Sequence, residues 1–194
     1  QYTIRTKGYE TITGTETVDA EAQVITKTLA KMVTWDGSFT LEPARDEDGT
    51  YLISNGPEMA WFAAKVNEEC QGHSGSTING KLIDNINLGN FDWTPIGAAI
   101  LQTGSTYKYY PGYKGTFDGN GKTVSGLKID NQENSQAFFG YVTTGAVIKN
   151  LTVEGSVTAK QFAGGIISQV EGGAAISNCV NNVNVTTIHQ GNAM

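Results

Sequence analysis

The spacing of apolar residues divides this chain of 194 residues into one helical stretch and a long series of short strands. Between Glu58 and Glu69 apolar side chains recur every three or four residues, which places them on one face of an α-helix. These positions are Met59, Phe62, Ala63 and Val66. Asn55 precedes them as a helix-capping residue, and a proline follows in the first turn. The sequence predicts a helix over Glu58–Glu69 that ends near Gly72, with Trp61 assigned to the core.

From Ile78 onward the apolar residues come in short runs separated by Gly, Asn and Asp, the pattern of strands joined by tight turns. Three of these runs resemble one another: Val124–Asp130 (VSGLKID), Ile148–Gly155 (IKNLTVEG) and Ile176–Val185 (ISNCVNNVNV). Leu127 lies 24 residues before Leu151, and Leu151 lies 28 residues before Cys179. A unit that returns at such intervals is typical of a solenoid, in which stacked turns of chain share one core.

We therefore expect a mainly β protein built as a right-handed parallel β-helix, a short solenoid. The inward positions would be Val124, Leu127, Ile129, Ile148, Leu151, Val153, Ile176, Cys179, Val183 and Val185. The corners would lie at Gly119–Gly121, Gly145, Gly155 and Gly172–Gly173, because glycine and asparagine tolerate the left-handed conformation. A β-sandwich is the alternative fold, since it also shows short strands at regular spacing.

Two asparagines precede matched positions of the repeat, Asn150 before Leu151 and Asn178 before Cys179. Their side-chain amides would stack and hydrogen-bond along the solenoid, or they are two turn asparagines that only coincide. The phrase Phe117–Gly121 (FDGNG) predicts a tight turn in which Asp118 bonds the backbone. Calcium binding is the other interpretation of this phrase, but the spaced acidic ligands of an EF-hand loop are missing.

Residues 1–48 differ from the rest. We expect them to be a linker, an N-terminal cap or the tail of a preceding module. Residues 49–194 would form the β-helix repeat domain. Strand-like alternation runs through Tyr2–Thr6 and Glu10–Thr15. A capping Asp19 predicts a helix over Ala20–Met32.

The formal net charge is −6, the pI is about 4.9, and the Lys and Arg residues are scattered, which argues against nucleic-acid binding. No run of 18 apolar residues is present, so we expect no membrane-spanning helix. The first ten residues are polar and are not a signal peptide, as in a mature chain or an excised piece.

The two cysteines, Cys70 and Cys179, permit one disulfide in an oxidising compartment; the other interpretation is two small buried thiols. There are two histidines and no CxxC or HExxH phrase, so we expect no metal site and no cofactor.

The order of these motifs, from the predicted helix through GTFDGNGK at 115–122 to GAVIKNLTV, resembles bacterial cell-surface proteins with GLUG-type repeats. The same module precedes the catalytic part of some IgA-specific metalloproteases. The resemblance covers about Gly49 to Val185, and FAGGIISQV at 162–170 approximates the Gly-Leu-Val-Gly phrase without matching it. It implies a right-handed β-helix with an N-terminal helix as lid, an extracellular position on the bacterial surface, and an adhesive or spacer role. It supplies no catalytic residue, and the zinc motif of the metalloproteases is missing here.

The best candidates for ligand binding are aromatic residues, because rings stack on sugar faces and tyrosine adds a hydroxyl. They are Tyr107, Tyr109, Tyr110 and Tyr113 of the insertion Ser105–Tyr113, extended by Trp93. Such a surface suits a glycan or a host surface protein; the alternative is a loop that packs its own rings against the solenoid.

A carbohydrate-active enzyme, either a polysaccharide hydrolase or a lyase, is the alternative function, since inverting hydrolysis needs two carboxyl groups about 6.5–9.5 Å apart. The available carboxylates are Asp84, Asp92, Asp118 and Asp130. They lie on different units, and we assign no catalytic residue.

The repeats stop near Val185 without an obvious cap. An uncovered solenoid end exposes apolar surface and unpaired strand edges, so we expect a C-terminal continuation or end-to-end self-association.

Overall fold

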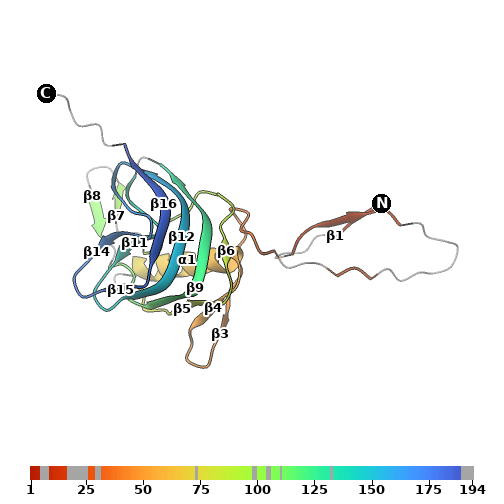
Figure 1. Ribbon diagram of the computed structural model, residues 1–194, viewed down its shortest axis with the longest axis horizontal. Helices are drawn as coiled ribbons and strands as arrows, with labels where there is room; N and C mark the ends of the chain where they lie inside the picture. The colour runs from red at the N-terminus through yellow and green to blue at the C-terminus, as the bar shows by residue number, and fades with distance from the viewer. Residues whose placement is uncertain are drawn as a thin grey trace.

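The computed structural model describes residues 1–4, 9–16, 26–28, 32–72, 74–97, 100–103, 106–109, 111–131 and 133–188 (Figure 1). This part of the chain is mainly β, with a largely parallel sheet and the one helix α1. The prediction of a mainly β protein is confirmed. The β-sandwich alternative is not supported, because its sheets are antiparallel.

The helix α1 spans Gly56–Gln71. The strands of the N-terminal half are β1 (Tyr2–Ile4), β2 (Ile12–Gly14), β3 (Ala44–Arg45), β4 (Tyr51–Ile53), β5 (Gly80–Leu82), β6 (Ile86–Asn87), β7 (Ile100–Thr103) and β8 (Thr106–Tyr109). Those of the C-terminal half are β9 (Thr116–Asp130), β10 (Asn134–Gln136), β11 (Phe139–Val142), β12 (Val147–Ala159), β13 (Gln161–Ala163), β14 (Ile167–Val170), β15 (Ala175–Ser177) and β16 (Val180–Thr187).

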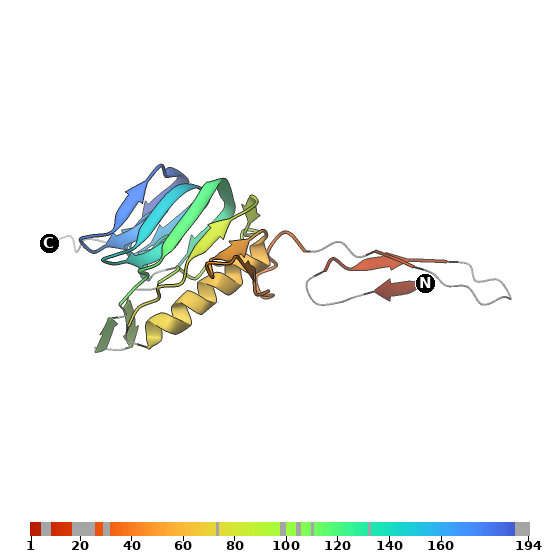
Figure 2. The ribbon, with the colours of Figure 1, turned by 90° about the horizontal axis from the view of Figure 1, so that it is seen from below.

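The largest sheet has the order β15-β12-β9-β5-β4-β3, with β16 also on β12 and β6 also on β9. All of its pairings are parallel except β3 with β4. Two more parallel pairs, β10 with β13 and β11 with β14, join the same successive segments of chain. Figure 2 shows the strands stacked one behind the next, with α1 crossing the end that β4 and β5 form.

The repeat is present, but the predicted match between its first two phrases, Leu127 with Leu151, is wrong. Across β12 and β16, Thr152 pairs with Val180, a shift of 28 residues that agrees with matching Leu151 to Cys179. Across β9 and β12, however, Leu127 lies opposite Gly155, and Leu151 lies opposite Lys122. The ladder shifts register twice there, and such irregularities cannot be seen when two sequence phrases are compared.

The predicted inward positions are buried in the first two of the three matched segments and largely exposed in the last. Those of β9 and β12 are at most 1% exposed: Val124, Leu127, Ile129, Ile148, Leu151 and Val153. Ile176 and Val185 are 47% and 41% exposed, and only Val183 is buried. The reason is that β15 and β16 each pair with β12 alone among the described strands.

The capping signal before α1 is confirmed. The Asn55 side chain accepts a hydrogen bond from the Glu58 backbone N–H at 3.0 Å, and the Glu58 carboxylate accepts from the Ser54 N–H at 2.7 Å. The helix ends before Gly72, as predicted, and it is two residues longer at each end than the predicted Glu58–Glu69.

The predicted apolar face of α1 is buried, and Phe62 is its central contact with the sheet. The Phe62 ring lies 5.6 Å from that of Phe117, 6.1 Å from that of Tyr51 and 6.3 Å from that of Tyr113, measured between ring centroids. One face of the helix therefore closes the core at the β4–β5 end of the sheet.

Gly155 does not form the predicted corner. It lies within β12 at a φ of 144°, and a Cβ there would collide with the Leu127 carbonyl oxygen. Glycine is required because β9 and β12 approach closely at this level.

In the N-terminal segment, β1 and β2 form the expected strands as an antiparallel hairpin that lies apart from the body in Figure 1. The predicted helix over Ala20–Met32 falls largely outside the described residues. Further on, the segment joins the body, because Thr34 bridges to Asn87 and the Trp35 N–H donates to the Asn87 carbonyl at 3.0 Å.

No helix within the described ranges is long and apolar enough to cross a membrane.

Candidate ligand-binding groove

Two adjoining cavities lie beside α1, between the helix and the segment 35–45. The first has a volume of about 490 Å³ and the second about 320 Å³. The first is lined by Thr40, Glu42, Arg45, Tyr51, Trp61, Ala64, Lys65 and Glu68. The second is lined by Trp35, Thr40, Ala60, Ala63, Ala64, Asn67, Trp93 and Thr94. Because Thr40 and Ala64 line both cavities, we treat them together as the α1 groove.

The first cavity has an aromatic wall made by Trp61 and Tyr51. Their ring centroids lie 5.1 Å apart at an interplanar angle of 53°. Trp61 is the helical neighbour of Phe62, so it points about 100° away from the core-facing ring and stays partly exposed. The Arg45 guanidinium lies 4.2 Å from the Tyr51 ring centroid and covers that buried ring. Trp61 therefore supplies the partly exposed aromatic surface of this cavity.

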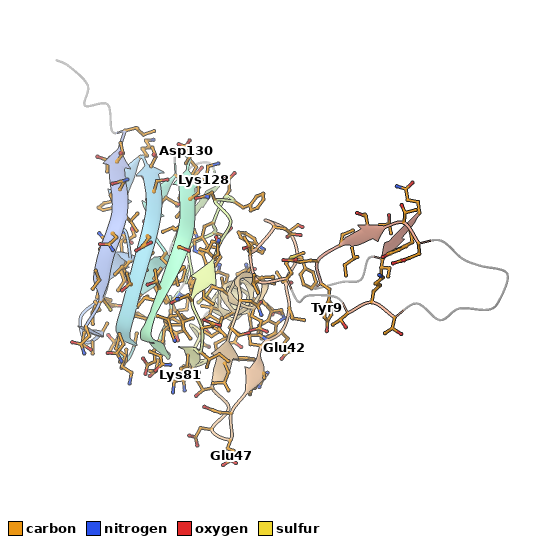
Figure 3. All side chains as sticks on the ribbon, turned by 45° about the vertical axis from the view of Figure 1, so that its right-hand side comes forward. Tyr9, Glu42, Glu47, Lys81, Lys128 and Asp130 are labelled. Atoms are coloured by element: carbon orange, nitrogen blue, oxygen red, sulfur yellow. The ribbon has the colours of Figure 1, made fainter. Side chains whose placement is uncertain are left out.

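Charged side chains form the rim of the first cavity, and they are paired with one another. Arg45 donates to Glu42 at 3.3 Å, and Lys65 donates to Glu68 at 3.0 Å. The hydrogen bond to Glu68 is the main reason that the pKa of Lys65 is raised. Figure 3 shows Glu42 on the side of the body that carries α1. Two acids and two bases leave this rim close to neutral.

The second cavity is more apolar and contains two tryptophans. The Trp35 and Trp93 rings meet edge to face, 5.7 Å between centroids. The Trp93 indole N–H donates to the Phe138 carbonyl at 3.2 Å. Trp35 is only 8% exposed, and its buried indole N–H has no hydrogen-bond acceptor in the described part of the chain. Buried polar groups are nearly always paired, so this donor needs an explanation.

Two residues of the predicted aromatic site, Trp93 and Tyr113, are buried. Trp93 lines the groove but is only 4% exposed. Tyr113 is fully buried, its hydroxyl donates to the Ile78 carbonyl at 2.9 Å, and burial raises the pKa of this phenol well above its usual range. Tyr107 and Tyr109 belong to the β7–β8 hairpin, and Tyr110 lies outside the described residues. Figure 2 shows this hairpin near the C-terminal end of α1.

The four candidate carboxylates lie elsewhere, since none of them lines the groove. Asp118 stands in register between Lys81 and Lys149 on the neighbouring strands, with its carboxylate 3.4 Å from the Lys149 ammonium. Asp130 lies at the other end of β9, near Lys128 (Figure 3).

Asp92 also lies at the Asp130 end of the sheet, where it bridges to Lys128 and pairs with its ammonium at 3.2 Å. Asp84 is exposed, and its carboxylate accepts from the Asn85 backbone N–H. Asp92 and Asp130 are therefore the pair that the fold brings to one end of the sheet.

Within the described ranges, no three side chains among His, Cys, Asp and Glu are close enough to hold a metal ion.

The sequence pattern missed the groove because its residues come from four segments, 35–45, Tyr51, 60–68 and 93–94. Trp61, Ala64, Lys65 and Glu68 recur at helical spacing on a second face of α1, and this was the available signal. Nothing local showed that residues 35–45 would lie over that face. Trp61 does contact the body through Tyr51, as its assignment to the core implies, but it also lines a cavity.

A scan against protein-family models found no matching family, and searches of the curated proteins and of the solved structures found no match.

Proposed function

We propose that this chain is a non-enzymatic module of a bacterial cell-surface protein, of the kind with GLUG-type repeats, and that it acts as an adhesin or spacer outside the cell. We further propose that its parallel strands form a right-handed β-helix with α1 as the lid. In such a module the fold presents a surface, and α1 closes one end.

The observation that carries this proposal is the parallel pairing of successive segments at two places along the chain. Phe117 of β9 pairs with Ile148 of β12, which in turn pairs with Ile176 of β15. In the same way Tyr113 bridges to Val142, which pairs with Val170. These two series of paired residues run through the same successive segments, as expected for the stacked turns of a β-helix.

The alternative is a carbohydrate-active enzyme on the same fold, and the placement of Asp92 and Asp130 at one end of the sheet favours it. The side chain of Asp92 is 83% exposed, however, and it is paired with Lys128. Release of reducing ends from a panel of polysaccharides would support the enzyme if it is lost in both Asp92→Asn and Asp130→Asn. Absence of turnover across the panel would support the binding module.

The experiment that tests the adhesin role is a glycan and host-protein binding screen with the intact chain. Specific binding that is lost on chemical unfolding supports an adhesin. Absence of binding at high protein concentration contradicts an adhesin and leaves the spacer role. A Tyr107→Ala/Tyr109→Ala variant in the same screen tests whether the β7–β8 hairpin contributes.

We also propose that the partner at the open β16 edge is a second copy of this chain. The described strands of this edge, β14, β15 and β16, contain no charged residue and no proline, the usual devices that prevent edge pairing. Val180 and Val185 are 51% and 41% exposed there. Two uncharged edges can meet without repulsion, although each chain carries a formal charge of −6.

Sedimentation at increasing concentration tests this association. We expect dimers that disappear when Val180 and Val185 are changed to lysine, because lysine on both copies introduces repulsion at the contact. The matched control is Thr77→Lys, which adds a lysine at an exposed position outside the edge strands. A chain that stays monomeric at millimolar concentration contradicts the proposal.

A further inference from the structure

We propose that the α1 groove binds a neutral carbohydrate chain, with one sugar ring stacked on Trp61 and an oxygen of the adjoining sugar accepting a hydrogen bond from the Trp35 indole N–H. This inference rests on the proposed binding function. It assigns that function to the groove and not to the tyrosine-rich hairpin.

The stacking surface is the first support. Trp61 is partly exposed at the cavity, and its neighbour Tyr51 restrains it, with ring centroids 5.1 Å apart. A ring that is already held in place loses little conformational entropy when a ligand packs on it. Tyr51 does not offer a second stacking surface, because the Arg45 guanidinium already covers its ring. A flat apolar sugar face fits the remaining surface, whereas a cationic ligand would meet the Arg45 guanidinium.

The unpaired donor is the second and independent support. The ring of Trp35 lies roughly perpendicular to those of Phe91 and Trp93, with ring centroids 6.3 and 5.7 Å apart. Its N–H is shielded from solvent and has no acceptor among the described residues, and the residue lines the second cavity. After a small turn of the indole toward that cavity, a hydroxyl, ring or glycosidic oxygen of a bound sugar would supply the acceptor, and a purely apolar ligand would not.

The charges of the rim decide between neutral and charged sugars. Glu42 is paired with Arg45, and Lys65 with Glu68, so no single sign dominates. The four groups can donate to and accept from sugar hydroxyls without attracting an ionic ligand. The carboxylate of a uronic acid would have to compete with Glu42 and Glu68 for their cations.

The volumes of the two cavities indicate room for more than one sugar unit. Each cavity, at about 490 and 320 Å³, falls within the range of small-molecule sites, and the two share Thr40 and Ala64. An oligosaccharide that crosses Thr40 would engage both Trp61 and Trp35. Loss of either contact should therefore weaken the binding of the same ligand.

The test is titration calorimetry of the intact chain against neutral tetrasaccharides of glucose, mannose and N-acetylglucosamine, with tetragalacturonate as the anionic comparison. We expect one of the neutral probes to bind. Trp61→Ala should weaken the binding of this probe at least tenfold. Trp61→Leu is a second variant, which keeps apolar contact with Tyr51. Trp35→Phe keeps an aromatic ring but removes the N–H, and should weaken binding about three- to tenfold. Thermal melting of each variant checks that the fold is retained.

The matched control is Tyr107→Ala/Tyr109→Ala, which we expect to leave binding to the neutral probe unchanged. If this variant loses the ligand while Trp61→Ala keeps it, the groove assignment is overturned and the adhesin role stands. Unchanged affinity in Trp35→Phe, or a preference for tetragalacturonate, also overturns the inference. No binding of any probe at millimolar concentration overturns it as well and leaves the spacer role of the module intact.

Discussion

The side-chain amide of Asn178 donates a hydrogen bond to that of Asn150 across adjacent strands, from Nδ2 to Oδ1 at 3.2 Å. Asn150 in turn donates to the carboxylate of Asp118 at 3.0 Å. Of the two interpretations that the sequence left open for these asparagines, stacking is therefore confirmed, and Asp118 extends the stack by one layer. Asn120, Asn150 and Asn178 have φ values of 52°, 54° and 51°, so the same bend recurs in three successive segments.

Asn150→Ala should destabilise the protein by about 2 kcal/mol or more. It removes two side-chain hydrogen bonds, each worth about 1 kcal/mol, and it places a residue with a Cβ but no local hydrogen bond at positive φ. Chemical denaturation measures the change. Asn150→Gly is the matched control, because glycine accepts positive φ but lacks the amide, and it should cost less. Equal losses in the two variants would contradict a conformational role for Asn150.

The protein should lose stability at acid pH through Asp118. Partial burial opposes ionisation of this carboxyl, but hydrogen bonds from the Asn150 side chain and the Asn120 N–H, together with the Lys149 ammonium, outweigh it and lower its pKa below the usual 3.8. A folded-state pKa below the unfolded value stabilises the fold above about pH 4, and this contribution is lost as the pH falls through the folded pKa.

The free energy of unfolding of the native protein and of Asp118→Asn should therefore differ at neutral pH and converge as the pH falls through the folded-state pKa of Asp118. Denaturation at a series of pH values measures this. A difference that is constant over the whole range would show that the ionised carboxylate is not the stabilising form.

Neighbouring residues of α1 should differ sharply in their effect on stability. Phe62→Ala should cost about 3–5 kcal/mol, since it empties a fully buried site among Tyr51, Tyr113 and Phe117. Trp61→Ala should cost clearly less, because that ring is partly exposed. Thermal and chemical unfolding of the two variants measures the difference. Similar losses would mean that Trp61 is a core residue and would leave less of it for a ligand.

The two cysteines should be alkylated as two free thiols, at different rates. Cys179 is partly buried, whereas Cys70 is buried in α1, where desolvation raises the pKa of its thiol. The thiolate is the reactive form, so Cys70 should be alkylated only after unfolding, and Cys179 much earlier. Mass spectrometry after timed alkylation, with and without denaturant, follows both sites. Rapid labelling of Cys70 in the folded protein would contradict the close packing of α1 on the sheet.

The local elements whose signals are contained in a few neighbouring residues could be predicted from the sequence. Asn55, the proline after it and Glu58 set the start of α1, because capping involves atoms only three residues apart. The inward positions of β9 and β12 followed from their apolar spacing, and the repeat offered the stacked amides of Asn150 and Asn178 as one of two interpretations.

Features that depend on contacts between distant segments became visible only in the folded chain. The register of β9 on β12 shifts twice, so Leu127 meets Gly155 and not Leu151. Ile176 has the same pattern as Ile148 but is exposed, because burial requires a further strand that β15 does not have among the described residues. The groove exists because residues 35–45 lie over one face of α1, where Trp61 is partly exposed and the Trp35 N–H has no acceptor among the described residues. These features arise from packing between segments, and no local pattern encodes them.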